Sequence, residues 1–94
     1  MQEYKIVRLT TKELIICKLV AQENASEIIM ENPYEVKSFL NPTNGEFNST
    51  LVDWLQFSNE KFTTVDTFNV MTMNNPEPSL LSYYEELLEK KSGI

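Results

Sequence analysis

The sequence has no histidine, a single cysteine and only two glycines in 94 residues. Without histidine, neither a Cys–His dyad nor a histidine metal ligand can form, and Cys17 has no partner for an internal disulfide bond. Two glycines are too few for a glycine-rich phosphate loop, and no nucleophile stands beside a base. We therefore expect a protein that is not an enzyme, with no catalytic residue and no cofactor.

Long apolar runs and an excess of basic charge are missing too. No segment approaches the roughly 20 apolar residues that span a bilayer, and no basic or apolar leader precedes the first strand pattern. These features predict a soluble, cytoplasmic protein that does not contact a membrane. The 8 Lys and Arg residues are outnumbered by 14 Asp and Glu, for a formal net charge of −6. That is the wrong sign for a protein whose main task is to grip phosphate backbones, although a local basic patch is compatible with it.

Hydrophobic residues make up 41% of the chain and aromatic residues 11%, which predicts a folded protein rather than a disordered one. We expect one domain, 1–94, near the lower size at which a chain buries enough apolar surface to be stable alone. Assembly with further copies would bury more. Residues 1–75 are expected to form a β-barrel and residues 76–94 a helix.

Two short apolar runs around a polar turn open the chain. Residues 4–9 carry apolar side chains at Tyr4, Ile6, Val7 and Leu9, and residues 14–20 are apolar at both odd and even positions, a pattern typical of a β-hairpin. The rival interpretation, a helix over residues 13–30, conflicts with the β-branched residues in that segment and with the turn-like sequence at 24–26. Because both faces of the hairpin carry apolar residues, both need cover.

Further strand patterns follow the hairpin. They lie at residues 27–34, 50–57, 62–65 and 70–73. Pro33 indicates that the third strand lies at a sheet edge or bends there. The clearest loop, at 41–45, ends in an Asn-Gly pair of the kind that tight turns favour.

The last part of the chain has helical spacing. The sequence at 74–78 stops the sheet, and Ser79 is expected to cap the N-terminus of a helix. Five apolar residues then fall on one helix face: Leu80, Leu81, Tyr84, Leu87 and Leu88. The predicted fold is mainly β, a strongly bent five-stranded antiparallel sheet or small barrel. Its C-terminal α-helix is expected to pack over an apolar face or an open end.

The segment from Val7 to Val36 resembles the first sequence motif of the Sm/LSm proteins. It matches that motif at most apolar positions, beginning with Val7-x-Leu9 for V-x-L, and at few polar ones. The other motif positions are Lys12 and Cys17 (glycines in the family), Glu23 (the loop aspartate) and Glu27-Ile28-Ile29-Met30 (N-L-x-L). A weaker resemblance to the second motif, a strand ending in I-R-G, lies at Val65-Asp66-Thr67.

The whole chain is similar to the Sm-like proteins of marine bacteriophages (cyanophages). Those proteins carry a T-x-E-x-[IL]-I-C hairpin, a W-L-x-F-S element and a proline-led Tyr-Tyr helix. In this sequence the three elements are Thr11 to Cys17, Trp54 to Ser58, and Pro78 to Tyr84. The resemblance implies that the chain is phage-encoded and acts in the cytoplasm of a bacterial host.

The resemblance to Sm proteins implies a homo-oligomeric ring of about five to seven subunits. Such a ring is closed by pairing the fourth strand of one subunit with the fifth strand of the next, and uridine or adenine bases bind near its pore, between the two motif loops. An aromatic ring and amide groups suit base stacking and base-edge hydrogen bonds. The residues assigned to this site are Asn24, Phe68 and Asn69 in the loops, with Arg8 and Lys12 on the first hairpin.

Two positions argue against that site. The family's loop asparagine is Glu27 here and its arginine is Asp66, so two hydrogen-bond donors have become negatively charged acceptors. Phe68 is also compatible with a core or interface position, and Arg8 and Lys12 with plain solvent-exposed charges. The main hypothesis is a ring that binds single-stranded RNA or DNA weakly. The alternative is a structural or protein-interaction ring that has lost nucleic-acid binding.

Glutamates recur every four residues at Glu23, Glu27, Glu31 and Glu35. On a helix this spacing would gather four carboxylates on one face, within reach of a metal ion. On strands, successive members are about 13 Å apart, too far to share one ion or to form a catalytic pair. We therefore expect a solvated acidic edge and no metal site.

Overall fold

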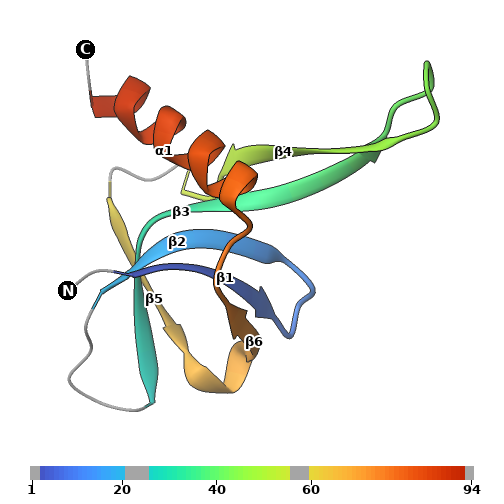
Figure 1. The fold of residues 1–94 in the computed structure, drawn as a ribbon. Helices are drawn as coiled ribbons and strands as arrows, with labels where there is room; N and C mark the ends of the chain where they lie inside the picture. The colour runs from blue at the N-terminus through green and yellow to red at the C-terminus, as the bar shows by residue number, and fades with distance from the viewer. Residues whose placement is uncertain (1–2, 21–25, 56–59, 93–94) are drawn as a thin grey trace.

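The computed structural model describes residues 3–20, 26–55 and 60–92. These residues form six strands, one short 3₁₀ turn and one α-helix (Figure 1). In chain order the elements are β1 (Glu3–Leu9), β2 (Leu14–Val20), β3 (Glu27–Leu40), β4 (Phe47–Asp53), β5 (Phe62–Asp66), η1 (Thr67–Asn69), β6 (Val70–Asn74) and α1 (Pro78–Ser92). The predicted fold, mainly β with a C-terminal helix, is confirmed. Within the described residues, no helix is long and apolar enough to cross a membrane.

The strands pair antiparallel in the order β4-β3-β2-β1-β6, with β5 added to β3. β3 is the long member of the sheet, and its two halves have different partners. Its first half, residues 27–31, pairs with β5, and its second half, residues 34–40, pairs with β4. The prediction that the third strand ends at Tyr34 is wrong, because β4 supplies a partner strand that carries β3 on to Leu40.

The two halves of β3 meet at a bulge formed by Asn32 and Pro33, which we call the junction. Both residues lie opposite the single residue Cys17 of β2, so the ladder is interrupted and the strand bends. Asn32 adopts a left-handed backbone conformation with φ 49°, which asparagine tolerates better than most residues. Pro33 has no N–H to lose from the ladder. The predicted bend at Pro33 is confirmed.

Apolar side chains gather in two layers, one on each face of the first hairpin. The barrel core consists of Val7, Leu9, Ile15, Cys17, Ile28 and Met30. The helix-side cluster consists of Ile16, Tyr34, Leu51 and Tyr84. Successive residues of β2 therefore enter different layers, as strand geometry requires. The expectation that both hairpin faces are covered is confirmed.

Helix α1 covers the helix-side cluster and lies across the sheet (Figure 1). It begins at Pro78, where the missing N–H costs nothing because the first turn of a helix has no acceptor for it. Ser79, the predicted cap, lies inside the first turn instead, and its hydroxyl donates to Glu77 Oε1 at 3.2 Å. The predicted apolar stripe is confirmed, since all its members pack in this cluster: Leu80, Leu81, Tyr84, Leu87 and Leu88.

Past the helix-side cluster, β3 and β4 continue as a paired hairpin arm, residues 38–49, which projects from the rest of the molecule (Figure 1). The arm turns at the predicted loop, where Gly45 donates its N–H to Asn41 O at 2.8 Å. Gly45 has φ 71°, which glycine adopts without steric cost. β4 begins earlier than predicted, at Phe47, and ends earlier, at Asp53. Large apolar side chains remain exposed on the arm: Phe39, Leu40 and Phe47.

Candidate functional site

Loops that are distant in the sequence meet at one end of the sheet. Thr67 donates its backbone N–H (2.9 Å) and its hydroxyl (3.1 Å) to the carbonyl oxygen of Ser26, just before β3. The β1–β2 turn joins them, because Thr10 donates its N–H to Asn69 O at 2.8 Å and its hydroxyl to Asn69 Oδ1 at 3.4 Å. We call Thr10, Ser26 and Thr67–Asn69 the loop cluster.

Two of the predicted site residues, Phe68 and Asn69, belong to the loop cluster. The Phe68 side chain is 92% exposed, so it is not a core residue, and the interface and base-stacking hypotheses both stay open. Asn69 is exposed, and its amide oxygen accepts from Thr10, which restrains the direction of the side chain. Asn24, the third predicted loop residue, lies outside the described residues.

Arg8 and Lys12 lie beside the loop cluster, at the end of β1 and in the β1–β2 turn. Both side chains are exposed, and Arg8 Nη1 donates to Lys12 O at 3.5 Å. Lys12 has φ 80°, a left-handed conformation that gives a physical reason for glycine at this position of the Sm motif. The structure thus brings Arg8 and Lys12 to the same end of the sheet as Phe68 and Asn69.

The other two basic residues of the first hairpin lie close to carboxylates. Lys5 Nζ lies 3.6 Å from Glu3 Oε2, and Lys18 Nζ lies 3.8 Å from Glu31 Oε2. Arg8 and Lys12 make no salt bridge with the residues that the structure describes. Within the described residues, the basic side chains of this hairpin that no carboxylate holds are therefore the two nearest the loop cluster.

Glu27 and Asp66 are direct cross-strand partners in the pairing of β3 with β5. Cβ atoms of such partners lie about 4.5–5.5 Å apart, and like charges in this arrangement destabilise a sheet. Asp66 is exposed and Glu27 is half-buried, and Asp66 directly precedes Thr67 of the loop cluster. The Sm motifs have asparagine at the position of Glu27 and arginine at the position of Asp66. The two hydrogen-bond donors that this chain lacks would therefore lie side by side.

Glu31 is a buried carboxylate, with only 5% of its surface exposed. Its Oε2 lies 3.8 Å from Lys18 Nζ and 3.9 Å from Lys61 Nζ, and these two positive charges offset the cost of removing a carboxylate from water. The predicted solvated acidic edge is therefore wrong at Glu31. Among the described residues, no group of three or more His, Cys, Asp or Glu is placed to hold a metal ion.

A hollow beside the loop cluster is lined by residues of the cluster and of the barrel core. Its walls include Leu9, Trp54 and Thr64 as well as Asn69, and Trp54 also packs against the core. Neither Trp54 nor Thr64 was expected at a site, and neither were the hydroxyl residues that tie the loops together. No sequence pattern marks a hydroxyl that bonds to a distant carbonyl.

The longest strand of this strongly bent antiparallel sheet pairs with two successive strands, and the loops of the sheet meet at one end. This arrangement is that of a small Sm-type barrel. Residues 6–85, from β1 into α1, match the Sm_like domain family, and the chain belongs to that family. The fold implied by the resemblance of the first hairpin is therefore confirmed. No curated protein matches the chain.

Proposed function

We propose that the protein assembles into a closed homo-oligomeric ring of about five to seven subunits and binds single-stranded RNA or DNA weakly at the loop cluster. The observation that carries this proposal is the pair of hydrogen bonds from Thr67 to Ser26. They join the two loops between which Sm proteins bind bases, with the exposed Phe68 and Asn69 beside them. The proposed role is one of binding, not catalysis.

Unpaired strand edges support the ring. Among the described residues, β5 pairs only with β3, and β6 pairs only with β1. An open edge tends to pair with another chain, and a closed ring lets the β4–β5 edge of each copy meet β6 of the next. Phe62 and Met71, which are 44% and 60% exposed on these strands, would gain cover in such an interface.

The charges near the loop cluster support weak binding. Arg8 and Lys12 attract phosphate, but Glu27 and Asp66 lie opposite each other in every subunit and repel it. Stacking against Phe68 and contacts to Asn69 add to the affinity. The attraction for phosphate rests on the exposed charges of Arg8 and Lys12, and salt screens such charges. Binding of short oligo-uridine or oligo-adenine should therefore fade quickly as salt is added.

The first experiment measures the molar mass by light scattering and the ultraviolet absorbance ratio of the purified protein, which reports bound nucleic acid. A ring gives a single mass near a whole multiple of 10.9 kDa. A clean monomer at micromolar concentration would refute the ring.

Fluorescence anisotropy of labelled oligonucleotides at low and physiological salt then measures binding. Tight, salt-resistant binding would show that the site lies elsewhere.

A double variant, Glu27→Asn with Asp66→Arg, tests the loop cluster directly. It restores donors at the two positions where Sm motifs have them, and we expect at least about tenfold tighter oligonucleotide binding. Its matched control is Glu46→Asn with Glu86→Arg, which makes the same change in charge at exposed sites on the arm and helix. Equal strengthening in both variants would show that net charge, not the site, governs binding.

The second candidate function is a structural or protein-interaction ring that has lost nucleic-acid binding. The cross-strand pairing of Glu27 with Asp66 favours this function. Two negative charges at this place repel phosphate as well as each other, and their mutual repulsion lowers the stability of the sheet. A wild-type ring that does not bind at low salt, with binding recovered in the double variant, would select this function. For the origin of the chain, we propose a phage gene that acts in the cytoplasm of a bacterial host, on the basis of the sequence resemblance at residues 11–17, 54–58 and 78–84.

A further inference from the structure

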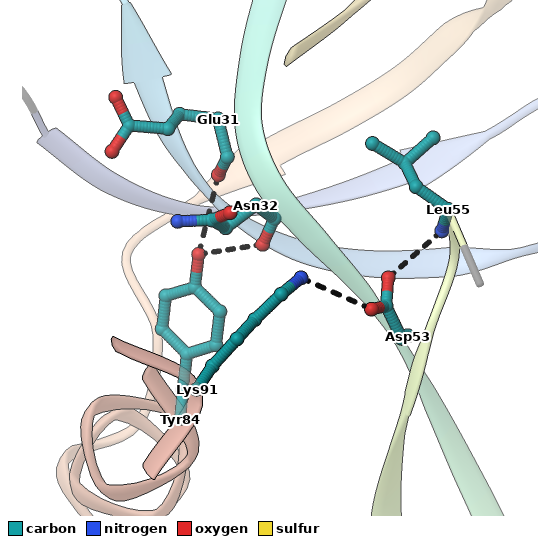
Figure 2. Close-up of polar contacts among 6 residues, drawn as sticks. All are labelled: Glu31, Asn32, Asp53, Leu55, Tyr84 and Lys91. Atoms are coloured by element: carbon teal, nitrogen blue, oxygen red, sulfur yellow. Dashed lines mark hydrogen bonds and ion pairs between the residues drawn. The ribbon is translucent and has the colours of Figure 1, made fainter. Parts of the chain in front are cut away.

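The bend in β3 brings two backbone carbonyl oxygens within reach of a side chain of α1. They belong to Glu31, which directly precedes the junction, and to Asn32 within it. The Tyr84 hydroxyl donates to Glu31 O at 3.3 Å and to Asn32 O at 2.7 Å (Figure 2). A hydrogen bond within the protein stabilises the conformation in which it forms, so one phenol stabilises the bend from the helix side.

A second contact joins the helix to the end of β4. Lys91 lies about two helical turns after Tyr84, and its Nζ donates to Asp53 Oδ2 at 3.1 Å. The other carboxylate oxygen, Asp53 Oδ1, accepts from Leu55 N–H at 2.9 Å, as Figure 2 shows. Helix α1 therefore makes hydrogen bonds both to the bend of β3 and to the C-terminal end of β4.

Packing fixes the position of the Tyr84 hydroxyl. The side chain is completely buried, and its ring lies edge-on to Tyr4 of β1 at 5.9 Å and to Tyr34 of β3 at 5.8 Å between centroids. Burial also raises the pKa of Tyr84 well above the ordinary value, so the phenol keeps its proton and remains a donor. A rigid donor of this kind restrains the two carbonyls that it binds.

We infer that Tyr84 is a positioning residue that sets the angle between the two halves of β3 and thereby the geometry of the ring. This inference rests on the proposed assembly. The first half of β3 carries β5 and the loop cluster, and the second half carries β4. Among the described residues, β4 and β5 each pair only with β3. Their outer edges must face one neighbouring subunit together, so the angle at the junction determines how many copies close the ring.

The test compares Tyr84→Phe, which keeps the ring and removes the donor, with Tyr83→Phe, which removes the hydroxyl of the exposed neighbour. Native mass spectrometry should show one subunit number for the wild type and for Tyr83→Phe, and several for Tyr84→Phe. The backbone N–H groups of Asn32 and Trp54, which bond across the junction, should exchange about tenfold faster in Tyr84→Phe. Exchange at Leu9, in the first hairpin, should change far less.

Faster exchange by the same factor at all three amides would show that Tyr84 only stabilises the whole fold, and would overturn the inference. An unchanged subunit number alongside unchanged exchange at Asn32 and Trp54 would overturn it as well. A monomeric wild type would refute the ring but leave the exchange comparison readable. In that case, faster exchange confined to the junction would support Tyr84 as the residue that fixes the bend, and the link to ring geometry would be lost.

Discussion

The two halves of β3 belong to one strand and share β2 as a neighbour, yet different layers cover them. The first half sends Ile28 and Met30 into the barrel core. The second half begins under α1 with the buried Tyr34 and ends in solvent, where Leu40 is 56% exposed. Both halves are rich in apolar residues, so the difference in burial follows from the element packed against each half and not from residue type.

This difference divides the molecule into parts that should respond to different changes. The first half depends on the β1–β2 hairpin and β5, and it carries the loop cluster. The second half depends on pairing with β4 along its length and on α1 near the junction. The arm at residues 38–49 has no covering layer among the described residues. Changes to α1, the barrel core, the junction and the arm should therefore have effects of decreasing size.

Truncation before Pro78 should have the largest effect. It removes α1 and exposes the helix-side cluster, including Ile16, Tyr34 and Leu51. Domains of this size are stable by only about 5–15 kcal/mol, and losing an entire covering layer should bring aggregation or the loss of a cooperative melting transition. Thermal unfolding followed by circular dichroism measures this. Leu81→Ser is the control, because the other apolar residues of the stripe should compensate for much of a single substitution. An unchanged melting curve on truncation would show that the helix contributes nothing to the stability of the sheet.

Met30→Ala, in the first half of β3, should have the next largest effect. Met30 is completely buried in the barrel core, and truncating such a side chain costs about 2–5 kcal/mol through lost transfer energy and a residual cavity. Urea unfolding measures the change in the free energy of unfolding. Phe39→Ala, a truncation of an arm residue that is 49% exposed, is the comparison. Similar losses in both variants would mean that the arm is covered in solution.

Cys17, opposite the junction, should make stability fall at alkaline pH. Burial raises the pKa of its thiol from 9.0 to about 12, so the thiol ionises in the unfolded chain before it does in the folded one. The protonated thiol therefore makes its full contribution to the free energy of unfolding below pH 9. This contribution is lost between pH 9 and pH 12, at about 1.4 kcal/mol per pH unit. Urea unfolding at several alkaline pH values, for the wild type and Cys17→Val, measures this contribution. Because buried tyrosines add a fall of the same sign in both proteins, only the difference between the two curves reports Cys17, and parallel curves would contradict the prediction.

The elements of the fold that local periodicity encodes were predictable. β1 and β2 are apolar at odd and even positions, which required two covering layers, and the helical stripe of α1 supplied one of them. The length of β3 was not predictable in this way. Pro33 marks a bend, but whether the strand continues beyond it depends on pairing with β4, a partner that the local sequence of β3 does not encode.

The candidate site shows the same limit. Phe68 and Asn69 were predicted from the resemblance to the loops that line the pore of Sm proteins, and the structure brings Arg8 and Lys12 to the same end of the sheet. The burial of Glu31 was missed because its two lysine partners come from other parts of the chain, and the approach of Lys18 depends on the register of β2 and β3. The Tyr84 hydroxyl was missed as a donor for a related reason, since its acceptors are backbone carbonyls at a distant bend.

Substitutions at the tip of the arm should have the smallest effect. Phe47 is 77% exposed and lies opposite Leu40 in the register of β3 and β4, so Phe47→Thr keeps a strand-forming residue and gives up little buried area. We expect a change within about 0.5 kcal/mol in the free energy of unfolding, typical of exposed sites. Leu51→Thr is the matched control, on the same strand face but buried beneath α1, and it should cost several times more. If Phe47→Thr costs as much as Leu51→Thr, the arm has a covering layer in solution and the contrast between the two halves of β3 disappears.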